Sequence, residues 1–501
     1  MQARRIHLNG IVQGVGFRPH VVRCARALKC TGWVLNDSHG VEIQIQHEDD
    51  GVLDEFEKTL VDDAPAAARI LEISSQTSAL EDLPDFSIRA SARNEHTSTL
   101  VSPDLATCDA CASELFDPQD RRYHYPFINC TNCGPRFTII EDLPYDRPVT
   151  SMSAFEMCPQ CAAEYADVTN RRYHAQPDAC FDCGPRLFFM DAGADTESGF
   201  DDDGALVLER RHLTREESDA IIAQACEHLR AGDVLAIKGL GGWHLACDAC
   251  NEDAVGRLRT RKRRPTKPLA VMVRDLDMAR AYAKVSEREA ALLENPARPI
   301  VLLERTASSP IAPNVAGDLP EIGLMLPATP LQHLLLHELG TPLVMTSGNR
   351  SGEPIVATDR EALDALGHIA DGFLGNNRAI VARYDDSVMR IDADGEEQMI
   401  RRARGYAPAP LLAKRDEGPV ILATGSEQKA TLTFLDGGRA YVSQHLGDLE
   451  HLGAMHAWEE ARERYERLFD AHPQVIACDM HPEYLASKWA REYAHEHGLP
   501  L

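Results

Sequence analysis

The sequence lacks a run of about twenty apolar residues, the length that a membrane-spanning helix needs. Its first residues, MQARRIHLNG, also lack the apolar region of a secretory signal. We therefore predict a cytoplasmic, soluble protein without a membrane partner. Positive charge is scarce as well, because 52 Lys and Arg face 78 Asp and Glu and the net charge is −26. A nucleic-acid surface must neutralise phosphates, so this balance argues against a nucleic-acid partner.

Cysteine carries the clearest pattern that is present. Eight of the 14 cysteines form four Cys-x-x-Cys pairs: Cys108/Cys111, Cys130/Cys133, Cys158/Cys161 and Cys180/Cys183. The last two pairs repeat the first two after 50 residues, and RRYHYPFINCTNCGPRF at 121–137 returns as RRYHAQPDACFDCGPRL at 171–187. The repeat indicates two tandem copies of one small unit within residues 104–190.

Each copy has the spacing of a four-cysteine zinc site. The 18 residues between the first two pairs fit a tetrahedral thiolate site, whereas the 24 residues from Cys133 to Cys158 do not. We therefore predict two structural Zn²⁺ ions, one for the first two pairs and one for the last two. A crossed pairing, first with fourth and second with third, stays open. Disulfides are disfavoured by the predicted compartment, and redox chemistry needs only one such motif.

The N-terminal segment predicts a phosphate-binding loop. Residues 4–12 alternate like a strand, and the sequence QGVGFR then precedes Pro19, which opens a helical stretch. The two glycines let successive N–H groups point at an anion, and Arg18 adds a planar fork of donors. A second strand with a loop begins at Gly32 and places Asn36 where its amide could orient water. The predicted loop consists of Gln13, Gly14, Val15, Gly16 and Phe17.

Two motifs in this segment, GxVQGVGFR and GWVxNxxxGxV, closely resemble the acylphosphatase family over residues 1–91. The resemblance implies a ferredoxin-like α/β domain. In that family the arginine and the loop amides hold phosphate and the asparagine positions the attacking water. Arg18 and Asn36 match those catalytic positions. The alternative is an ordinary βαβ unit with a tight turn.

A basic run marks the third part of the chain. A helix from about Glu216 leads into one strand, VLAIKGLGGWHLACDA, and a second helix then precedes RLRTRKRRPTKPLAVMV. Seven cationic side chains lie between Arg257 and Lys267, and Pro265 and Pro268 are expected to keep the segment extended. We interpret it as a triphosphate cradle. A solvated basic loop or a nucleic-acid patch is the alternative if the run is considered alone.

Three further motifs follow in order: MLPATPLQHLLL, LVMTSGNRSGEPI and FLGNNRAIVARYDDSVMR. Together with the basic run they resemble the YrdC-like family over residues 205–390, an α/β domain that forms acyl adenylates from ATP and a carbamate-type acid. His244 and His333 lie in apolar runs, where a lone histidine is more often a core residue, and they are left unassigned. Cys247 and Cys250 are interpreted as packing. The nucleotide and acyl candidates by motif position are Lys238, Arg264, Lys267, Thr346, Ser347, Asn349 and Arg390.

The last part predicts hairpins over residues 419–446, a long helix over 453–469, and then QVIACDMHPEYLASKWA. These pieces resemble the start of the sugar-kinase-like (actin-type) α/β domain of tRNA threonylcarbamoyl transferases, over residues 391–501. Asp479 and His481, in a DxHPxY motif, are the tentative transfer residues. An alternation of β and α elements predicts a strand after the final helix, so we expect a truncated chain with an incomplete last domain.

At 501 residues the chain predicts about three or four domains, and we assign it to the α/β multidomain class. The domain order resembles the HypF carbamoyltransferases of [NiFe]-hydrogenase maturation. This resemblance implies hydrolysis of carbamoyl phosphate, adenylation of the carbamate with ATP and Mg²⁺, and transfer of the carbamoyl group to the C-terminal cysteine of HypE, as a precursor of a cyanide ligand. Two alternatives remain: a threonylcarbamoyl-adenylate synthase, which would lack an acylphosphatase domain, and a non-catalytic zinc-finger binding protein.

Overall fold

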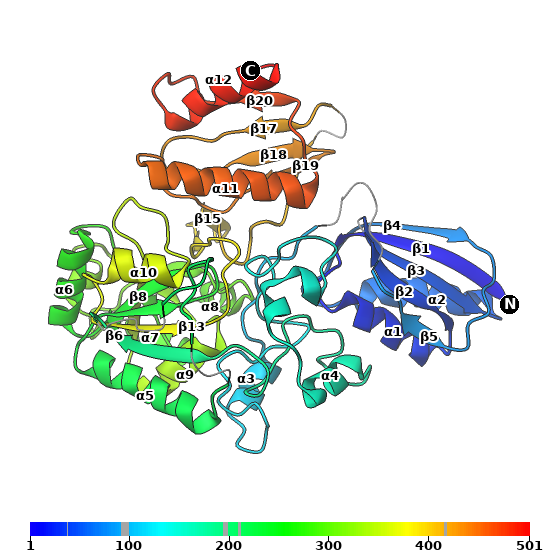
Figure 1. The fold of residues 1–501 in the computed structure, drawn as a ribbon, viewed down its shortest axis with the longest axis horizontal. Helices are drawn as coiled ribbons and strands as arrows, with labels where there is room; N and C mark the ends of the chain where they lie inside the picture. The colour runs from blue at the N-terminus through cyan, green and yellow to red at the C-terminus, as the bar shows by residue number, and fades with distance from the viewer. Residues whose placement is uncertain (38, 92–99, 194–198, 209–211, 415–417) are drawn as a thin grey trace.

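The computed structural model describes residues 1–37, 39–91, 100–193, 199–208, 212–414 and 418–501. These residues form three sheets, with a region of short helices and loops between the first sheet and the other two (Figure 1). Within these ranges, no helix is both long and apolar enough to cross a membrane.

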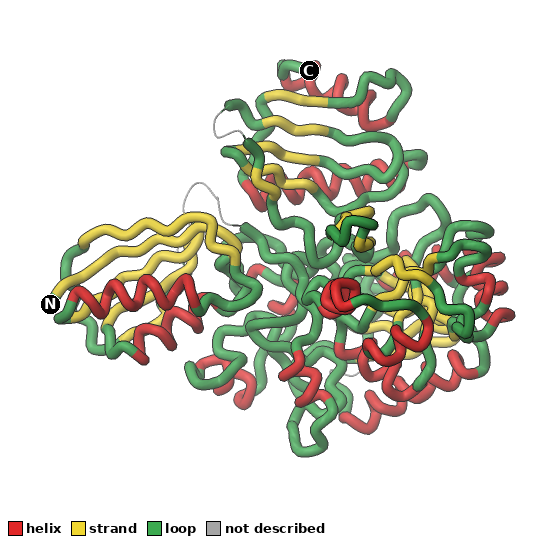
Figure 2. Tube along the Cα trace, turned by 180° about the vertical axis from the view of Figure 1, so that it is seen from behind, coloured by secondary structure: helices red, strands yellow, loops and turns green. Residues whose placement is uncertain are grey.

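The first sheet has five strands, and two helices cover one of its faces (Figures 1 and 2). The strand–loop–helix that the sequence predicts is confirmed, and the second predicted strand is a hairpin of β2 and β3. Buried side chains such as Ile43 of the sheet and Val21 and Phe56 of the helices form its core. In the order β4-β1-β3-β2-β5, the elements are β1 (Gln2–Ile11), β2 (Thr31–Asp37), β3 (Gly40–His47), β4 (Arg69–Thr77), β5 (Phe86–Ile88), α1 (Phe17–Ala27) and α2 (Asp50–Asp62).

The cysteine-rich region repeats its structure as well as its sequence. Helices α3 (Asp109–Leu115) and α4 (Pro159–Ala166) each begin directly after the first cysteine of their unit. In each unit, the histidine of RRYH has a left-handed backbone, with φ 62° at His124 and 55° at His174. Two short 3-10 turns, η1 (Arg147–Val149) and η2 (Ser151–Ala154), connect the units.

The second sheet has ten strands in the order β15-β14-β10-β11-β9-β12-β8-β7-β13-β6. Its edge strand, β6 (Leu187–Asp191), follows the last cysteine pair directly, so the second zinc unit continues into this sheet. The other strands are β7 (Leu235–Lys238), β8 (Trp243–Asp248), β9 (Val271–Met272), β10 (Ile300–Glu304), β11 (Glu321–Met325), β12 (Leu343–Ser347), β13 (Gly372–Asn376), β14 (Val388–Ile391) and β15 (Glu397–Arg401). The helices are α5 (Arg215–Arg230), α6 (Glu252–Lys262), α7 (Leu276–Tyr282), α8 (Glu287–Glu294), α9 (Pro330–Leu339), α10 (Asp359–Leu366) and the turn η3 (Pro313–Val315).

Two expectations for this part are wrong. The segment expected to be one strand is an antiparallel hairpin of β7 and β8, because residues 239–242 turn the chain back. A Cβ atom at Gly241 would lie 2.1 Å from the Cβ of Tyr384, so the turn requires a residue without a side chain. The basic run is also not extended, since α6 continues to Lys262.

The arginines of α6 stabilise neighbouring loops, which explains their number without a polyanion. Arg257 donates to the carbonyl of Gly232, and Arg259 donates to the carbonyl of Val315 at 3.0 Å. Arg261 forms an ion pair with Asp371 at 2.9 Å. All three arginines of α6 therefore have partners within the protein.

The third sheet confirms the predicted C-terminal hairpins and the long helix. Gly437 and Gly438 form the turn between β18 and β19. Arg464 of α11 donates to the carbonyl of Ile140 at 3.1 Å, which connects this sheet to the region between the zinc units. In the order β16-β19-β18-β17-β20, the elements are β16 (Leu411–Leu412), β17 (Ile421–Ala423), β18 (Thr433–Asp436), β19 (Arg439–Val442), β20 (Val475–Ala477), α11 (Leu452–Phe469) and α12 (Leu485–His497).

Candidate active site

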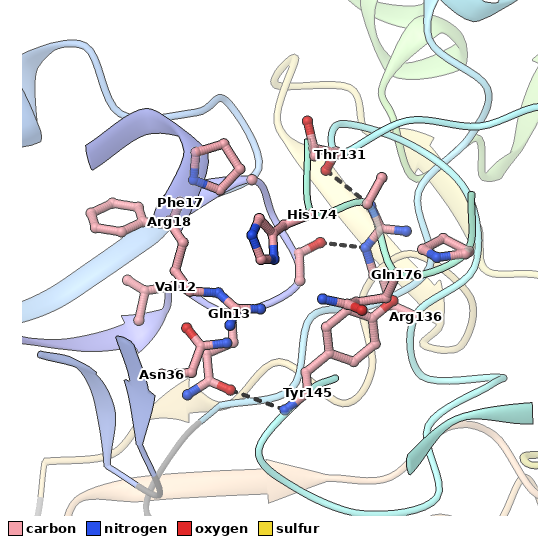
Figure 3. A pocket seen from close by; sticks show the side chains of 15 residues that line it. Val12, Gln13, Phe17, Arg18, Asn36, Thr131, Arg136, Tyr145, His174 and Gln176 are labelled. Carbon is pink, nitrogen blue, oxygen red and sulfur yellow. Dashed lines mark hydrogen bonds between the residues drawn. The ribbon is translucent and has the colours of Figure 1, made fainter. Parts of the chain in front are cut away.

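The predicted phosphate loop lines a small cavity between the first sheet and the zinc units (Figure 3). Gly14 and Gly16 have φ values of 71° and 75°, the left-handed region in which glycine is favoured. The side-chain amide of Gln13 donates to the carbonyl oxygens of Asp37 and Gly40, at 2.8 and 2.7 Å. The loop is thereby fixed to the turn of the β2–β3 hairpin.

Arg18 and Asn36 lie in this cavity, so the structure brings both predicted catalytic residues to the loop. The buried guanidinium of Arg18 donates to Asp146 at 2.9 Å and to the hydroxyl of Ser91 at 3.3 Å. Asn36 is buried, and neither polar atom of its side chain has a hydrogen-bond partner among the described residues. A buried amide without a partner is costly, which indicates a position prepared for water or substrate.

The opposite wall of the cavity comes from the zinc units, and the sequence analysis did not identify these residues. Arg136 donates from Nε to the carbonyl of Gly14 and so connects this wall to the phosphate loop. Burial and the charge of Arg18 lower the pKa of His174 to about 4, so its imidazole is neutral near pH 7. Thr131 and Gln176 complete this wall. These residues lie in or next to the repeated motifs RRYH and NCTNCGPR, so the repeat was the sequence feature that could have identified them.

A second polar cluster forms around the TSGN loop after β12. The hydroxyl of Ser347 donates to Oδ1 of Asn349 at 2.8 Å. The ammonium of Lys262, which is 1% exposed, donates to the carbonyl of Ser347 at 2.7 Å and to Oδ1 of Asn349 at 2.6 Å. Burial, reinforced by the nearby charge of Arg264, lowers the pKa of Lys262 to about 7. Lys262 belongs to the basic run but was absent from the predicted set.

Lys238 and Arg390, two other members of the predicted nucleotide set, do not lie at this loop. Lys238 is buried in an ion pair with Asp359 at 2.6 Å and lines a different cavity. Arg390 lies on β14, which three strands separate from β12 in the sheet, and donates to Gln398 at 2.6 Å. Arg264 donates to the carbonyl of Pro268 at 2.7 Å. The remaining members of the set are Thr346, which is buried on β12, and Lys267, which is exposed.

The tentative transfer residues lie in the loop before α12. The ring of His481, which is exposed, stacks on Tyr484 with 4.2 Å between the ring centres. The backbone carbonyl of Asp479 accepts a hydrogen bond from Ser487 at 3.0 Å.

The residues left unassigned in the sequence have structural surroundings. His244 contacts Asp386 at 3.3 Å, and burial lowers the pKa of His333 to about 4. Cys247 is buried and Cys250 half-buried, and the two belong to none of the metal-ligand clusters that the described residues form.

The eight motif cysteines form two clusters, Cys108–Cys111–Cys130–Cys133 and Cys158–Cys161–Cys180–Cys183. This grouping is the predicted pairing, and the crossed pairing is wrong. Sulfur–sulfur separations of 3.5, 3.7 and 3.9 Å occur in the first cluster, and 3.5, 3.7 and 3.8 Å in the second. Four sulfurs at about 2.3 Å from one tetrahedral zinc lie about 3.8 Å apart, so both clusters fit Zn²⁺ and no disulfide is formed.

The two zinc units are interlocked by arginines that cross from one to the other. Arg121 of the first unit donates to the thiol sulfur of Cys161 at 3.0 Å and forms an ion pair with Glu164 at 2.8 Å. Arg171, its counterpart 50 residues later, donates to Cys111 at 2.9 Å and pairs with Glu114 at 2.7 Å. Each cluster therefore receives a hydrogen bond from the opposite unit.

The buried carboxylate of Asp178 lies between one arginine of each zinc unit. Asp178, which is fully buried, lies 2.9 Å from Arg122 and 3.4 Å from Arg172. Burial raises the pKa of Asp178 to about 6, while the two arginines favour its ionised form. Charged side chains of the two units thus form one connected network of ion pairs.

Four family models match parts of the chain, in the order of the predicted domains. They are the acylphosphatase family over residues 4–88, the HypF finger over 107–140 and 157–190, the Sua5/YciO/YrdC family, described as telomere recombination, over 227–403, and the HypF Kae1-like domain over 416–501. The predicted α/β multidomain class, with its tandem zinc modules, is confirmed.

Similar proteins cover nearly the whole chain. The carbamoyltransferase HypF of Synechocystis sp. is 45% identical over 99% of this chain and 61% of that protein. The carbamoyltransferase HypF of Rhodobacter capsulatus is 46% identical over 100% of this chain and 64% of that protein. A crystal structure of full-length HypF in the phosphate- and nucleotide-bound form has a TM-score of 0.91 and 45% identity, covering 100% of this chain and 62% of the other. The chain spans about three-fifths of the length of these relatives.

The crossed arginines predict that loss of Arg121 weakens zinc binding in the opposite unit. In Arg121→Ala, zinc should leave the cluster of Cys158 and Cys161 about tenfold faster or more, because hydrogen bonds to ligands tune metal affinity. Chelator challenge followed by alkylation and mass spectrometry identifies the exposed cysteines.

The matched control is Gln119→Ala, an exposed residue close to Arg121 in sequence. Earlier alkylation of Cys108 and Cys111 than of the second cluster would show that the arginine acts within its own unit, against the crossing.

Proposed function

This chain belongs to the HypF family, and we propose on that basis that it is a carbamoyltransferase. It hydrolyses carbamoyl phosphate, adenylates the released carbamate with ATP to carbamoyl-AMP, and passes the carbamoyl group to the C-terminal cysteine of a HypE-type partner. The relatives that carry the carbamoyltransferase name are longer than this chain, so the complete sequence of steps belongs to this proposal.

The first step takes place at the phosphate loop. Carbamoyl phosphate and water give carbamate, inorganic phosphate and a proton. Arg18 and the N–H groups of the loop at Gly14 and Gly16 neutralise the phosphoryl oxygens, while the unpartnered amide of Asn36 orients the attacking water. Because phosphoryl transfer needs positioning and charge neutralisation more than covalent chemistry, this small set of groups is sufficient.

The second step takes place around the TSGN loop. Carbamate attacks the α-phosphate of ATP, so that carbamoyl-AMP forms and pyrophosphate leaves with Mg²⁺. Lys262 and Arg264 supply positive charge beside the hydroxyls of Thr346 and Ser347 and the amide of Asn349. Lys267, Lys238 and Arg390 remain candidates for phosphate and carbamate contacts, and Asp479 and His481 for the transfer step.

One observation carries this proposal: a single segment of the first zinc unit, residues 126–136, lines both the phosphate-loop cavity and a second cavity against the ten-stranded sheet. Thr131 and Arg136 face the first cavity, and Phe127 and Asn129 face the second. Carbamate decomposes readily in water, so a second cavity directly behind the wall of the first would keep it from bulk water on its way to the TSGN loop. The two structural Zn²⁺ ions would fix this wall.

Four domains divide the work in this proposal. Residues 1–91 are the acylphosphatase-like domain, 104–190 the zinc region, 205–390 the YrdC-like domain and 391–501 part of a sugar-kinase-like transfer domain. A threonylcarbamoyl-adenylate synthase would need neither Arg18 nor the loop, and a non-catalytic zinc-finger protein would need no unpartnered amide at Asn36. The first cavity therefore favours the carbamoyl phosphate reaction over both.

Arg18→Ala should abolish the first step, because the main phosphate counter-charge disappears. We expect phosphate release from carbamoyl phosphate to fall by about 100-fold or more. Malachite-green detection of phosphate measures this loss. The exposed Arg23→Ala, on the same helix, is the control. Full phosphate release from the Arg18 variant would refute the assignment.

Lys262→Met should separate the two steps. Pyrophosphate release that depends on carbamoyl phosphate and ATP should fall by about 100-fold, because the TSGN loop loses its cation. Phosphate release at the first cavity should continue. Arg274→Met, an exposed position in the same domain, is the control. Equal loss of both products in a folded variant would contradict a role confined to adenylation.

The lowered pKa of Lys262 predicts proton uptake when nucleotide binds. The free amine is mostly neutral at pH 8, since its pKa is about 7, and a nearby triphosphate favours the ammonium. ATP binding should therefore take up about one proton per chain at pH 8 and almost none at pH 6. Calorimetry in buffers of different ionisation enthalpy measures this uptake. An uptake that persists in Lys262→Met would assign it to another group.

A further inference from the structure

Arg378 is a buried cation without a partner. It follows β13 and is 8% exposed, and its guanidinium has no hydrogen bond or ion pair among the residues that the structure describes. Its only close contact of that kind is with the ring of Phe127, whose centre lies 5.5 Å from the guanidinium carbon. The buried carboxyl group of Asp104 acts on Arg378 electrostatically but forms no ion pair with it. A buried guanidinium without an ion-pair partner is expensive, which indicates that an anion completes the site.

Arg378 lines the second cavity, where two other polar groups are present. The ammonium of Lys238 donates to Asp359 at 2.6 Å and to the carbonyl of Asn376 at 2.9 Å, and its third N–H has no partner among the described residues. Oδ1 of Asn129 is buried and also has no partner within them. Two donors and one acceptor therefore surround the same space.

The orientation of Asn129 is fixed by the protein. Its amide nitrogen donates to the carbonyls of Phe127 and Pro177, each at 2.9 Å, so the oxygen must be the free atom. An acceptor next to two cations is suited to a ligand that combines a negative charge with an N–H or O–H donor. A simple carboxylate without a donor would leave Oδ1 of Asn129 unsatisfied.

The cavity is small. Its volume, measured as the space open to the centre of a water molecule, is about 30 Å³. This is room for about two or three water-sized groups and too little for a nucleotide. Pro177, which holds Asn129, also lines the phosphate-loop cavity. Gly239, in the wall of the second cavity, lies close to His244, because a Cβ atom at Gly239 would be 2.8 Å from the His244 ring. His244 on β8 is the strand partner of Ser347 on β12, so the second cavity lies near the TSGN loop.

We propose that Arg378, Lys238 and Asn129 form a holding site for a one-carbon carboxylate that bears a hydrogen-bond donor. Carbamate from the first cavity is its physiological ligand, and bicarbonate has the same chemistry. Arg378 and Lys238 bind the carboxylate oxygens, and Asn129 accepts from the amino group. Carbamate is bound here after its release from the first cavity and before its adenylation. This inference rests on the proposed function and adds a specific binding site to it.

Direct binding tests the site in the zinc-loaded full chain. The probe is ¹³C-bicarbonate, followed by NMR line broadening, with saturating inorganic phosphate to occupy the first cavity. Arg378→Gln should bind bicarbonate about tenfold more weakly or worse, and the exposed Arg280→Gln should bind it like the wild type. Unchanged binding by Arg378→Gln would overturn the proposal.

The role of Asn129 is tested on the unaltered protein, which avoids any folding defect. Formate has the carboxylate but no donor, so it should bind the wild type about two- to tenfold more weakly than bicarbonate. Formate binding as tight as bicarbonate binding would remove Asn129 from the site. This comparison remains decisive if Arg378→Gln does not fold.

Coupling of the two steps gives a second measurement. In the wild type, phosphate and pyrophosphate should appear in similar amounts from carbamoyl phosphate and ATP. In Arg378→Gln the ratio of phosphate to pyrophosphate should rise about tenfold, since unheld carbamate decomposes, and Arg378→Lys should restore part of the coupling. An unchanged ratio would refute the holding site alone, whereas absence of pyrophosphate from the wild type would refute the proposed function.

Discussion

The arrangement of this protein depends on the crossed contacts between its two zinc units. Each unit alone is a short helix and a few turns, too small to form a core. Each set of four cysteines fits one Zn²⁺ ion, and Arg121 and Arg171 bind the cluster of the opposite unit. Asp178 lies between their neighbours Arg122 and Arg172 at the centre. Because the ion pairs are largely buried, they orient the two units in one way rather than merely attaching them.

That rigid pair provides surfaces for all of its neighbours. Arg136 reaches the phosphate loop, β6 joins the ten-stranded sheet, and the connection between the units accepts a hydrogen bond from α11. The first cavity is therefore a property of two domains. An isolated acylphosphatase fold would expose Arg18 and Asn36 to water, whereas here His174 and Gln176 cover them. Because one wall of the cavity comes from the zinc units, the motif residues of the first domain alone do not describe it.

The sequence was informative where the chemistry is local. The cysteine spacing predicted the correct metal clusters, and the glycine loop with Arg18 predicted the first cavity, because each set lies within a few turns of chain or in a recognisable motif. The β7–β8 hairpin was missed because the apolar residues run on through the glycines. Lys262 was missed because seven cations within eleven residues hide which one is buried. Arg378 gave no local signal, since Phe127, its aromatic contact, lies about 250 residues earlier.

The two histidines of the repeated RRYH motif show what the duplication made possible. Both have the same left-handed backbone, yet His124 pairs with Asp219 on α5 at 3.0 Å, while His174 lines the first cavity. One backbone geometry therefore places the two side chains in different surroundings. A substitution at the first histidine would disturb a contact with the ten-stranded domain, whereas the same substitution at the second would change the wall of the phosphate-loop cavity.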